Sequence, residues 1–391
     1  MAASVTAASC GDRVLLIEKS PALGRKISAS GNGRCNLMNA GAPKYYGDTG
    51  FARKVLDNCT KETLLLYWDN LGIRLCEEND GRLYPCTFHS STVTDAYRIR
   101  LKTAGVDIRL QTSVKQIDRT DHFFVIYTEH GNFQASRVLI ACGGAASPRL
   151  GGTDSGAVLL SGFGHSIFPF RPALCPLTTD PKSISGLSGI RVKCAAALKN
   201  ADGKTLSHQE GEVLFTDYGI SGICVMQTAR FAGSGSLLVL DLTSRIYPDM
   251  NQLICMLLRR QKLVLDFPPE TLLTGILVPK LSFAVMKQAG IQMKGRKAGD
   301  LSEKEIRAVA EKSRCYILNV TGLRGMEDAQ ATAGGADCSE FDPRTMQSLK
   351  ENGLYAAGEV LNVDGDCGGY NLMFATASGI LAGLNGRRRP V

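Results

Sequence analysis

The chain opens with MAASVTAASCGDRVLLIEKS (residues 1–20), and this stretch decides the fold. Alanines and other small residues at 2–9 predict a helix, and the Gly-Asp pair after them predicts a turn. The apolar run from Arg13 to Glu18 predicts a buried parallel strand that ends on a carboxylate. A helix, a turn and a strand with an acidic end are typical of the second half of a nucleotide-binding βαβ unit.

Glu18 occupies the position at which such a unit carries an acid for the ribose hydroxyls. A complete unit has a G-x-G-x-x-G loop before the helix, and the acid follows that loop by about 20 residues. Glu18 lies 17 positions after Met1, so the spacing predicts a glycine loop before the first methionine and an N-terminally truncated domain. A carboxylate here favours the adenosine of FAD or NAD over that of NADP. The alternative is that Glu18 ends a surface strand after an ordinary helix.

Glycines and cations are interleaved in the segment that follows, PALGRKISASGNGRCNLMN (residues 21–39). Its low apolar content predicts a loop that presents donors to an anion and lets the backbone approach a planar ring. An ordinary glycine-rich surface loop is the alternative. The cofactor-binding candidates in and beside this segment are Lys19, Arg25, Lys26, Gly33, Arg34, Cys35 and Asn36.

Two later segments carry similar signals. RVLIACGGAASP (residues 137–148) is an apolar strand that breaks into a Gly-Gly pair, and it supplies the candidates Ala141, Gly143 and Gly144. GLYAAGEVLNVDGDCGGYNLMFATASGILAG (residues 353–383) predicts a short strand, a turn and a helix of small residues. A helix that starts at Gly-Gly-Tyr-Asn can stabilise negative charge on the N1–C2=O edge of a flavin. The candidates here are Gly358, Glu359, Gly369, Tyr370, Asn371 and Leu372.

Taken together, these segments resemble the HI0933/BaiN-like (aminoacetone oxidase-like) family of FAD-dependent oxidoreductases. The segments GRKISASGNGRCNLMN and AAGEVLNVDGDCGGYNL carry the resemblance, which covers nearly the whole chain. It implies an α/β fold with a discontinuous Rossmann-like FAD-binding domain, FAD as cofactor, and backbone contacts from Val114 to the adenine.

The pattern along the chain predicts three domains. Alternating strands and helices place the FAD-binding domain at 1–174 plus 321–391. Short glycine-bearing strands predict a β-barrel-like insertion at 175–244 plus 314–320, and helical spacing predicts a small helical domain at 245–313. Within the helical stretch, Ser302 followed three residues later by Glu305 predicts a capping box.

Bulk composition limits the class of protein. The net charge is +8, but 45 basic residues are mixed with 37 acidic ones. We therefore expect a small-molecule substrate and no nucleic acid, and we interpret the GRRRP tail as a solvated terminus. No apolar run is long enough for a membrane span. Thirteen scattered cysteines without a CxxC pair indicate reduced thiols in a cytoplasmic protein, and no metal site is expected. The sequence does not predict the oligomeric state.

No side chain is an obvious catalyst, because a flavin would itself carry out the redox step. Cys35 and Tyr218 are the catalytic candidates, with Asp217 as an orienting carboxylate for the tyrosine. The alternatives are a packed thiol at Cys35 and a packing loop around Tyr218. His89 could donate a proton, or could cap the helix that follows it.

We therefore expect hydride transfer through FAD to or from a small organic molecule, with NAD(P)H or oxygen as the second partner. One alternative is a truncated, non-catalytic relative that binds FAD weakly. The other is a flavin-dependent tRNA-modifying protein.

Overall fold

The computed structural model describes residues 1–384, and these form two compact units. The first unit combines Met1–Ala173 with the segment that begins at Ala329, and the second is Leu174–Asp328. The chain therefore leaves the first unit and returns to it. The basic GRRRP tail lies outside the described residues.

The first unit is mixed α/β. Its helices are α1 (Ala2–Ser9), α2 (Arg25–Ala29), α3 (Thr49–Asn58), α4 (Lys61–Asn70), α5 (Ser90–Thr103), α6 (Ser155–Ser161) and α12 (Tyr370–Leu384). Its strands are β1 (Leu15–Ile17), β2 (Met38–Asn39), β3 (Tyr45–Gly47), β4 (Leu75–Glu78), β5 (Arg82–Pro85), β6 (Asp107–Arg109), β7 (Val114–Arg119), β8 (Phe124–Thr128), β9 (Gly131–Ala135), β10 (Val138–Ile140), β11 (Ile167–Ala173), β18 (Ala331–Ala336), β19 (Leu354–Ala356) and β20 (Val363–Gly365).

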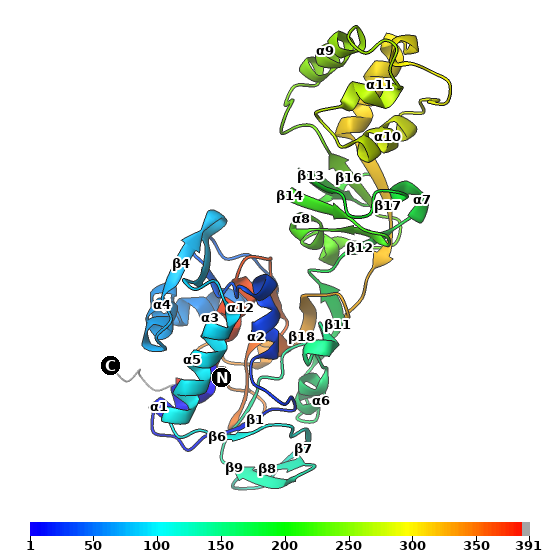
Figure 1. Cartoon of the computed structure of the whole chain (residues 1–391). Helices are drawn as coiled ribbons and strands as arrows, with labels where there is room; N and C mark the ends of the chain where they lie inside the picture. The colour runs from blue at the N-terminus through cyan, green and yellow to red at the C-terminus, as the bar shows by residue number, and fades with distance from the viewer. Residues whose placement is uncertain (385–391) are drawn as a thin grey trace. The chain divides into compact units, whose positions relative to one another are not determined.

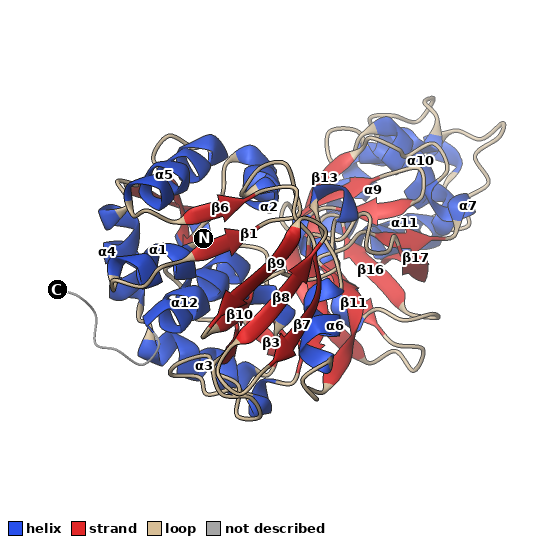
Figure 2. Cartoon of the chain, turned by 90° about the horizontal axis from the view of Figure 1, so that it is seen from below, coloured by secondary structure: helices blue, strands red, loops and turns tan. Residues whose placement is uncertain are grey.

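The opening stretch folds as predicted, into helix α1 and strand β1. β1 pairs in parallel with β6, and β10 pairs in parallel with β19, which comes from the returning segment. Helix α1 packs against α12, and a Cβ at Gly383 would lie only 2.6 Å from the carbonyl oxygen of Ala3 (Figure 2). Small residues on both helices permit this close approach.

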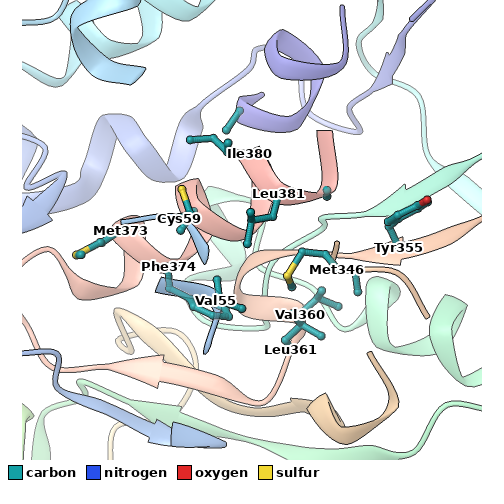
Figure 3. Close-up of a cluster of buried hydrophobic side chains, with 14 of the residues drawn as sticks. Val55, Cys59, Met346, Tyr355, Val360, Leu361, Met373, Phe374, Ile380 and Leu381 are labelled. Atoms are coloured by element: carbon teal, nitrogen blue, oxygen red, sulfur yellow. The ribbon is translucent and has the colours of Figure 1, made fainter. Parts of the chain in front are cut away.

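A single hydrophobic core joins both chain segments of the first unit. Figure 3 shows Phe374 and Leu381 of α12 among Val55 of α3 and Val360 and Leu361 of the returning segment. All five side chains are buried. Burial of this many apolar side chains is the main stabilising contribution to the unit.

The second unit contains a closed barrel with the strand order β12-β15-β14-β13-β16-β17, which confirms the predicted barrel (Figure 1). The strands are β12 (Leu177–Thr179), β13 (Arg191–Lys199), β14 (Thr205–Phe215), β15 (Gly219–Ser221), β16 (Leu237–Asp241) and β17 (Tyr316–Leu323). The helices are α7 (Pro181–Ile184), α8 (Ile223–Met226), α9 (Met250–Gln261), α10 (Pro279–Gln288) and α11 (Glu303–Arg314).

Helix α11 begins at the predicted capping box, in which the Ser302 hydroxyl accepts the Glu305 N–H and the Glu305 carboxylate accepts the Ser302 N–H. β17 continues the barrel to Leu323, beyond the predicted boundary at 320. A separate helical domain at 245–313 stays a prediction. Among residues 1–384, no helix is both long and apolar enough to cross a membrane.

One cysteine pair corrects the expectation that all thiols are reduced. Cys76 of β4 and Cys86, which directly follows β5, form a disulfide, and the remaining eleven cysteines, all within the described residues, form none. The antiparallel β4–β5 hairpin brings the two residues together although ten positions separate them. A search for CxxC spacing cannot detect a pair that is created by strand register.

Candidate FAD-binding site

Glu18 lies at the carboxyl end of β1, at the edge where parallel strands place ligand-binding residues. Its backbone is fixed, because its N–H donates to the carbonyl of Arg109 and its own carbonyl accepts the Thr112 N–H. The Oε1 atom accepts the Ser20 N–H at 2.8 Å. Oε2 makes no hydrogen bond with the residues that the structure describes, so it is free to accept one from a ligand. Lys19 beside it is exposed.

The segment after β1 is partly helical, where the sequence predicted a loop. α2 and a 3₁₀ turn at Ser30–Gly33 follow Gly24, and Gly24, Gly31 and Gly33 all adopt positive φ. These left-handed residues divide the segment into separate short turns. A Cβ at Gly33 would meet no atom within 4 Å, so the backbone there borders open space.

The cations of this segment have different partners. Arg25 donates to the carbonyl of Arg149 at 2.8 Å. Arg34 forms an ion pair with Glu78 at 2.7 Å, and its guanidinium lies over the rings of Tyr84 and Phe88. The ion pair and the two aromatic rings therefore hold the Arg34 side chain beside the β4–β5 hairpin.

Glu359 connects three of the predicted segments. Its Oε2 accepts the Gly144 N–H at 3.0 Å and pairs with the Lys26 ammonium at 3.1 Å, and its Oε1 accepts the Thr332 N–H at 2.7 Å. Lys26 also donates to the carbonyl of Gly144. We call Lys26, Gly144, Thr332 and Glu359 the Glu359 cluster. Because one carboxylate binds all of these groups, it fixes the relative positions of the segments that bear them.

Thr332 was not predicted from the sequence. Its hydroxyl accepts the Ala146 N–H at 2.9 Å, and a Cβ at Gly144 would lie 2.4 Å from that hydroxyl oxygen. Gly144 is thus required for close packing on β18. Gly143 has a positive φ of 75°, and Ala141 is exposed directly after the buried end of β10.

The start of α12 is held in a fixed conformation. Asn371 both accepts the Gly365 N–H and donates to the Gly365 carbonyl, and the Tyr370 carbonyl accepts the Tyr45 hydroxyl. Gly369 has a φ of 100°, and a Cβ there would lie 2.3 Å from the carbonyl oxygen of Met38. The N–H groups of the first turn, which include those of Asn371 and Leu372, have no acceptor within the helix.

Asn36 lies beside this helix start. Its Oδ1 is buried and has no hydrogen-bond partner among the described residues, and a Cβ at Gly369 would lie 2.7 Å from it. A buried acceptor without a donor is costly, so this position favours a ligand that supplies an N–H.

The catalytic candidates differ in their surroundings. Burial raises the pKa of the Cys35 thiol to about 11, which disfavours the thiolate needed for redox chemistry. Tyr218 and the exposed Asp217 lie in the second unit, where the Arg324 guanidinium stacks over the Tyr218 ring at 4.3 Å. His89 is the N-cap residue of α5, but its side chain forms no capping hydrogen bond.

The residues of the first unit fit FAD. Glu18 offers a carboxylate oxygen to ribose, Asn36 offers an unpaired acceptor, and the first turn of α12 offers N–H donors. Val114 starts β7 and is half-buried; its predicted contact with adenine stays a prediction. No group of three or more metal-ligating side chains occurs in the described part of the chain.

Comparison with known proteins agrees with this geometry. The sequence model of the HI0933-like protein Rossmann domain matches residues 1–385. The chain belongs to the HI0933-like family. It therefore has the Rossmann-like FAD-binding fold and is an FAD-dependent oxidoreductase, as the resemblance implied.

Two curated relatives and one solved structure are similar to this chain. A 3-dehydro-bile acid delta(4,6)-reductase of Clostridium scindens is 33% identical over 100% of this chain and 97% of its own. A ribosomal RNA dihydrouridine synthase of Escherichia coli is 27% identical over 97% of this chain and 93% of its own. The 3-ketosteroid-delta4-(5alpha)-dehydrogenase of Rhodococcus jostii RHA1 has a TM-score of 0.49 at 14% identity and covers 99% of this chain and 94% of its own.

Proposed function

We propose that this protein reduces a carbon–carbon double bond conjugated to a carbonyl group in a small organic molecule, with NAD(P)H as electron donor. The names of both curated relatives denote saturation of such a bond, in a 3-dehydro-bile acid and in uridine. FAD supplies the two-electron chemistry when it is bound. The chain's own residues bind the cofactor, orient it and exclude water.

The unpaired Asn36 Oδ1 beside the start of α12 is the observation that carries this proposal. An acceptor and a row of helix N–H donors at one position are complementary to the N–H and C=O groups along one edge of a flavin ring. The helix dipole also favours the negative charge of the reduced ring. The Glu359 cluster acts indirectly, because it positions the segments that bear Lys26 and Gly144. Cys35 has no role in this scheme beyond packing.

A second candidate is reduction of a pyrimidine ring in RNA. The E. coli relative favours it, since that protein forms dihydrouridine. A double bond next to a carbonyl is the reacting group in both candidates, so the same site serves either substrate.

Anaerobic half-reactions test the proposal. The purified chain is expected to contain FAD, to be reduced by NADH or NADPH, and then to be reoxidised by one equivalent of an enone such as androst-4-ene-3,17-dione or 2-cyclohexen-1-one. The product should gain two mass units, and the saturated ketones should leave the flavin reduced. Asn36→Leu should lower FAD content more than Asn32→Ala, a change at an exposed position of the same segment.

The reductase proposal fails if oxygen reoxidises the flavin but no enone does. Reoxidation by a uridine-containing RNA alone would favour the second candidate. A purified chain that lacks FAD and does not take it up would favour the weakly binding relative.

A further inference from the structure

The charge of the chain is concentrated in the helical part of the second unit. Residues 245–314 contain thirteen lysines and arginines against seven aspartates and glutamates, a net charge of +6. All other described residues contain 29 basic and 30 acidic side chains. The prediction of no nucleic-acid partner used the average over the whole chain, and that average conceals this difference.

Many of these cations are available for a partner. Nine of the thirteen form no ion pair with any residue that the structure describes. Arg260 donates to the carbonyl of Thr274. The other eight are Arg245, Arg259, Lys262, Lys280, Lys287, Lys294, Lys304 and Lys312. Of these eight, all except Lys312 are exposed. Such a cluster attracts a polyanion, because no internal carboxylates neutralise it.

Helix α10 places an aromatic ring between two of these lysines. Lys280, Phe283 and Lys287 are separated by three and four residues, so they share one face of the helix. The opposite face is buried through Leu281, Val285 and Met286, while Phe283 remains 49% exposed. Lys294 follows in the loop after α10. We call Lys280, Phe283, Lys287 and Lys294 the α10 face (Figure 1 shows α10).

We propose that the α10 face binds a single-stranded segment of nucleic acid. The three lysines contact successive phosphates, and a base stacks on Phe283. An anionic membrane fits less well, because a membrane-binding helix needs a continuous apolar face, and the apolar face of α10 is already buried in the protein. One isolated ring between cations matches one base. This inference does not rest on the reductase proposal.

Fluorescence anisotropy with the full-length, FAD-loaded chain tests this surface. The probes are fluorescein-labelled 20-mers of oligouridylate and oligodeoxythymidylate. If three phosphates are contacted, log Kd should change with log salt with a slope of about 2, so binding should weaken about 20-fold between 50 and 200 mM salt. Preference for one oligomer distinguishes RNA from DNA.

Two variants separate the contributions of charge and stacking. Lys280→Gln/Lys287→Gln should weaken binding at least 10-fold and lower the salt slope by about 1.4, because two phosphate contacts are lost. Phe283→Ala should weaken binding about 5-fold or more without a change in slope, and Phe283→Trp should restore it. Lys54→Gln/Lys102→Gln, which removes two exposed lysines from the first unit, is the matched control and should bind normally.

The proposal is wrong if neither oligomer binds, if the control pair weakens binding as much as the α10 pair, or if phosphatidylglycerol vesicles bind and the oligomers do not. Circular dichroism and FAD content of each variant establish that it is folded. A Phe283→Trp variant with normal affinity keeps the test valid if Phe283→Ala does not fold.

Discussion

Removing the Glu359 carboxylate should destabilise the first unit in particular. In Glu359→Ala the N–H groups of Gly144 and Thr332 lose a charged acceptor, and Lys26 loses its ion pair. Hydrogen bonds to a charged group contribute about 1.5–3 kcal/mol each, which gives about 3–6 kcal/mol for the two N–H groups. The ion pair adds less than about 1 kcal/mol, because Lys26 is one-third exposed.

Glu359→Gln should cost less, about 1.5–3 kcal/mol, since the amide oxygen can still accept one N–H. Its NH₂ group then faces a donor in place of the lost carboxylate oxygen. The free energy of unfolding should therefore increase from Glu359→Ala to Glu359→Gln to wild type, because the number of hydrogen bonds and the charge at this position increase in that order.

Urea unfolding followed by tryptophan fluorescence measures the stability of the first unit, to which Glu359 belongs. The chain contains one tryptophan, Trp68, which is buried in the first unit. The control is Glu129→Gln, at an exposed pair with Lys115, which should cost less than about 1 kcal/mol. The reasoning is refuted if Glu359→Ala unfolds at the same urea concentration as Glu129→Gln.

Three further outcomes are expected. Gly369→Ala should abolish folding or FAD retention, because the new Cβ would meet the Met38 carbonyl. Gly33 also has a positive φ but faces open space, so Gly33→Ala should lower the free energy of unfolding by only about 1–2 kcal/mol. Equal flavin content and stability in both variants would contradict this. Burial opposes ionisation of Glu340, but hydrogen bonds from Lys350, Ser166 and His165 lower its pKa to about 2. The stability that its carboxylate provides should therefore be complete above pH 4.5 and lost as the pH falls toward 2. Urea unfolding of Glu340→Gln at a series of pH values should lack this loss at acidic pH. Alkylation of the denatured chain should modify eleven cysteines without reductant and thirteen with it, and thirteen in both cases would show that the Cys76–Cys86 disulfide does not form.

Local signals in the sequence predicted much of the fold. The helix and strand of the opening stretch and the Ser302 capping box each depend on residues close together in the chain. The short strands of the barrel also have a local pattern, although its closure joins β12 to β17, which lie far apart in the chain. Hydrophobic periodicity, helix-capping residues and turn residues are sufficient to predict such elements. The glycine pair before α12 was also predicted, because a helix start has a short-range signature.

Contacts between distant segments were not predicted. Thr332 has no motif that distinguishes it, and its role follows only from the approach of β18 to Gly144. Arg34 stays a predicted cofactor-binding residue; its contacts with Glu78 and the rings of Tyr84 and Phe88, which lie in or just after the β4–β5 hairpin, were not predicted. The prediction that Glu359 binds the cofactor stays a prediction; its contacts with Lys26, Gly144 and Thr332, which link separate segments, were not predicted. The contacts of Thr332, Arg34 and Glu359 depend on how segments distant in the chain pack together, which local sequence patterns do not show.

The pairing of β10 with β19 and of α1 with α12 has a consequence for synthesis on the ribosome. The barrel strands β12–β17 are complete once residue 323 has emerged, so the second unit can acquire its structure early. The first unit must wait, with β10 unpaired and α1 uncovered, until the final helix leaves the exit tunnel. Flavin capture is consequently expected only after α12 has emerged, and a chain interrupted between Leu323 and Tyr370 would carry a folded barrel attached to an incomplete nucleotide domain.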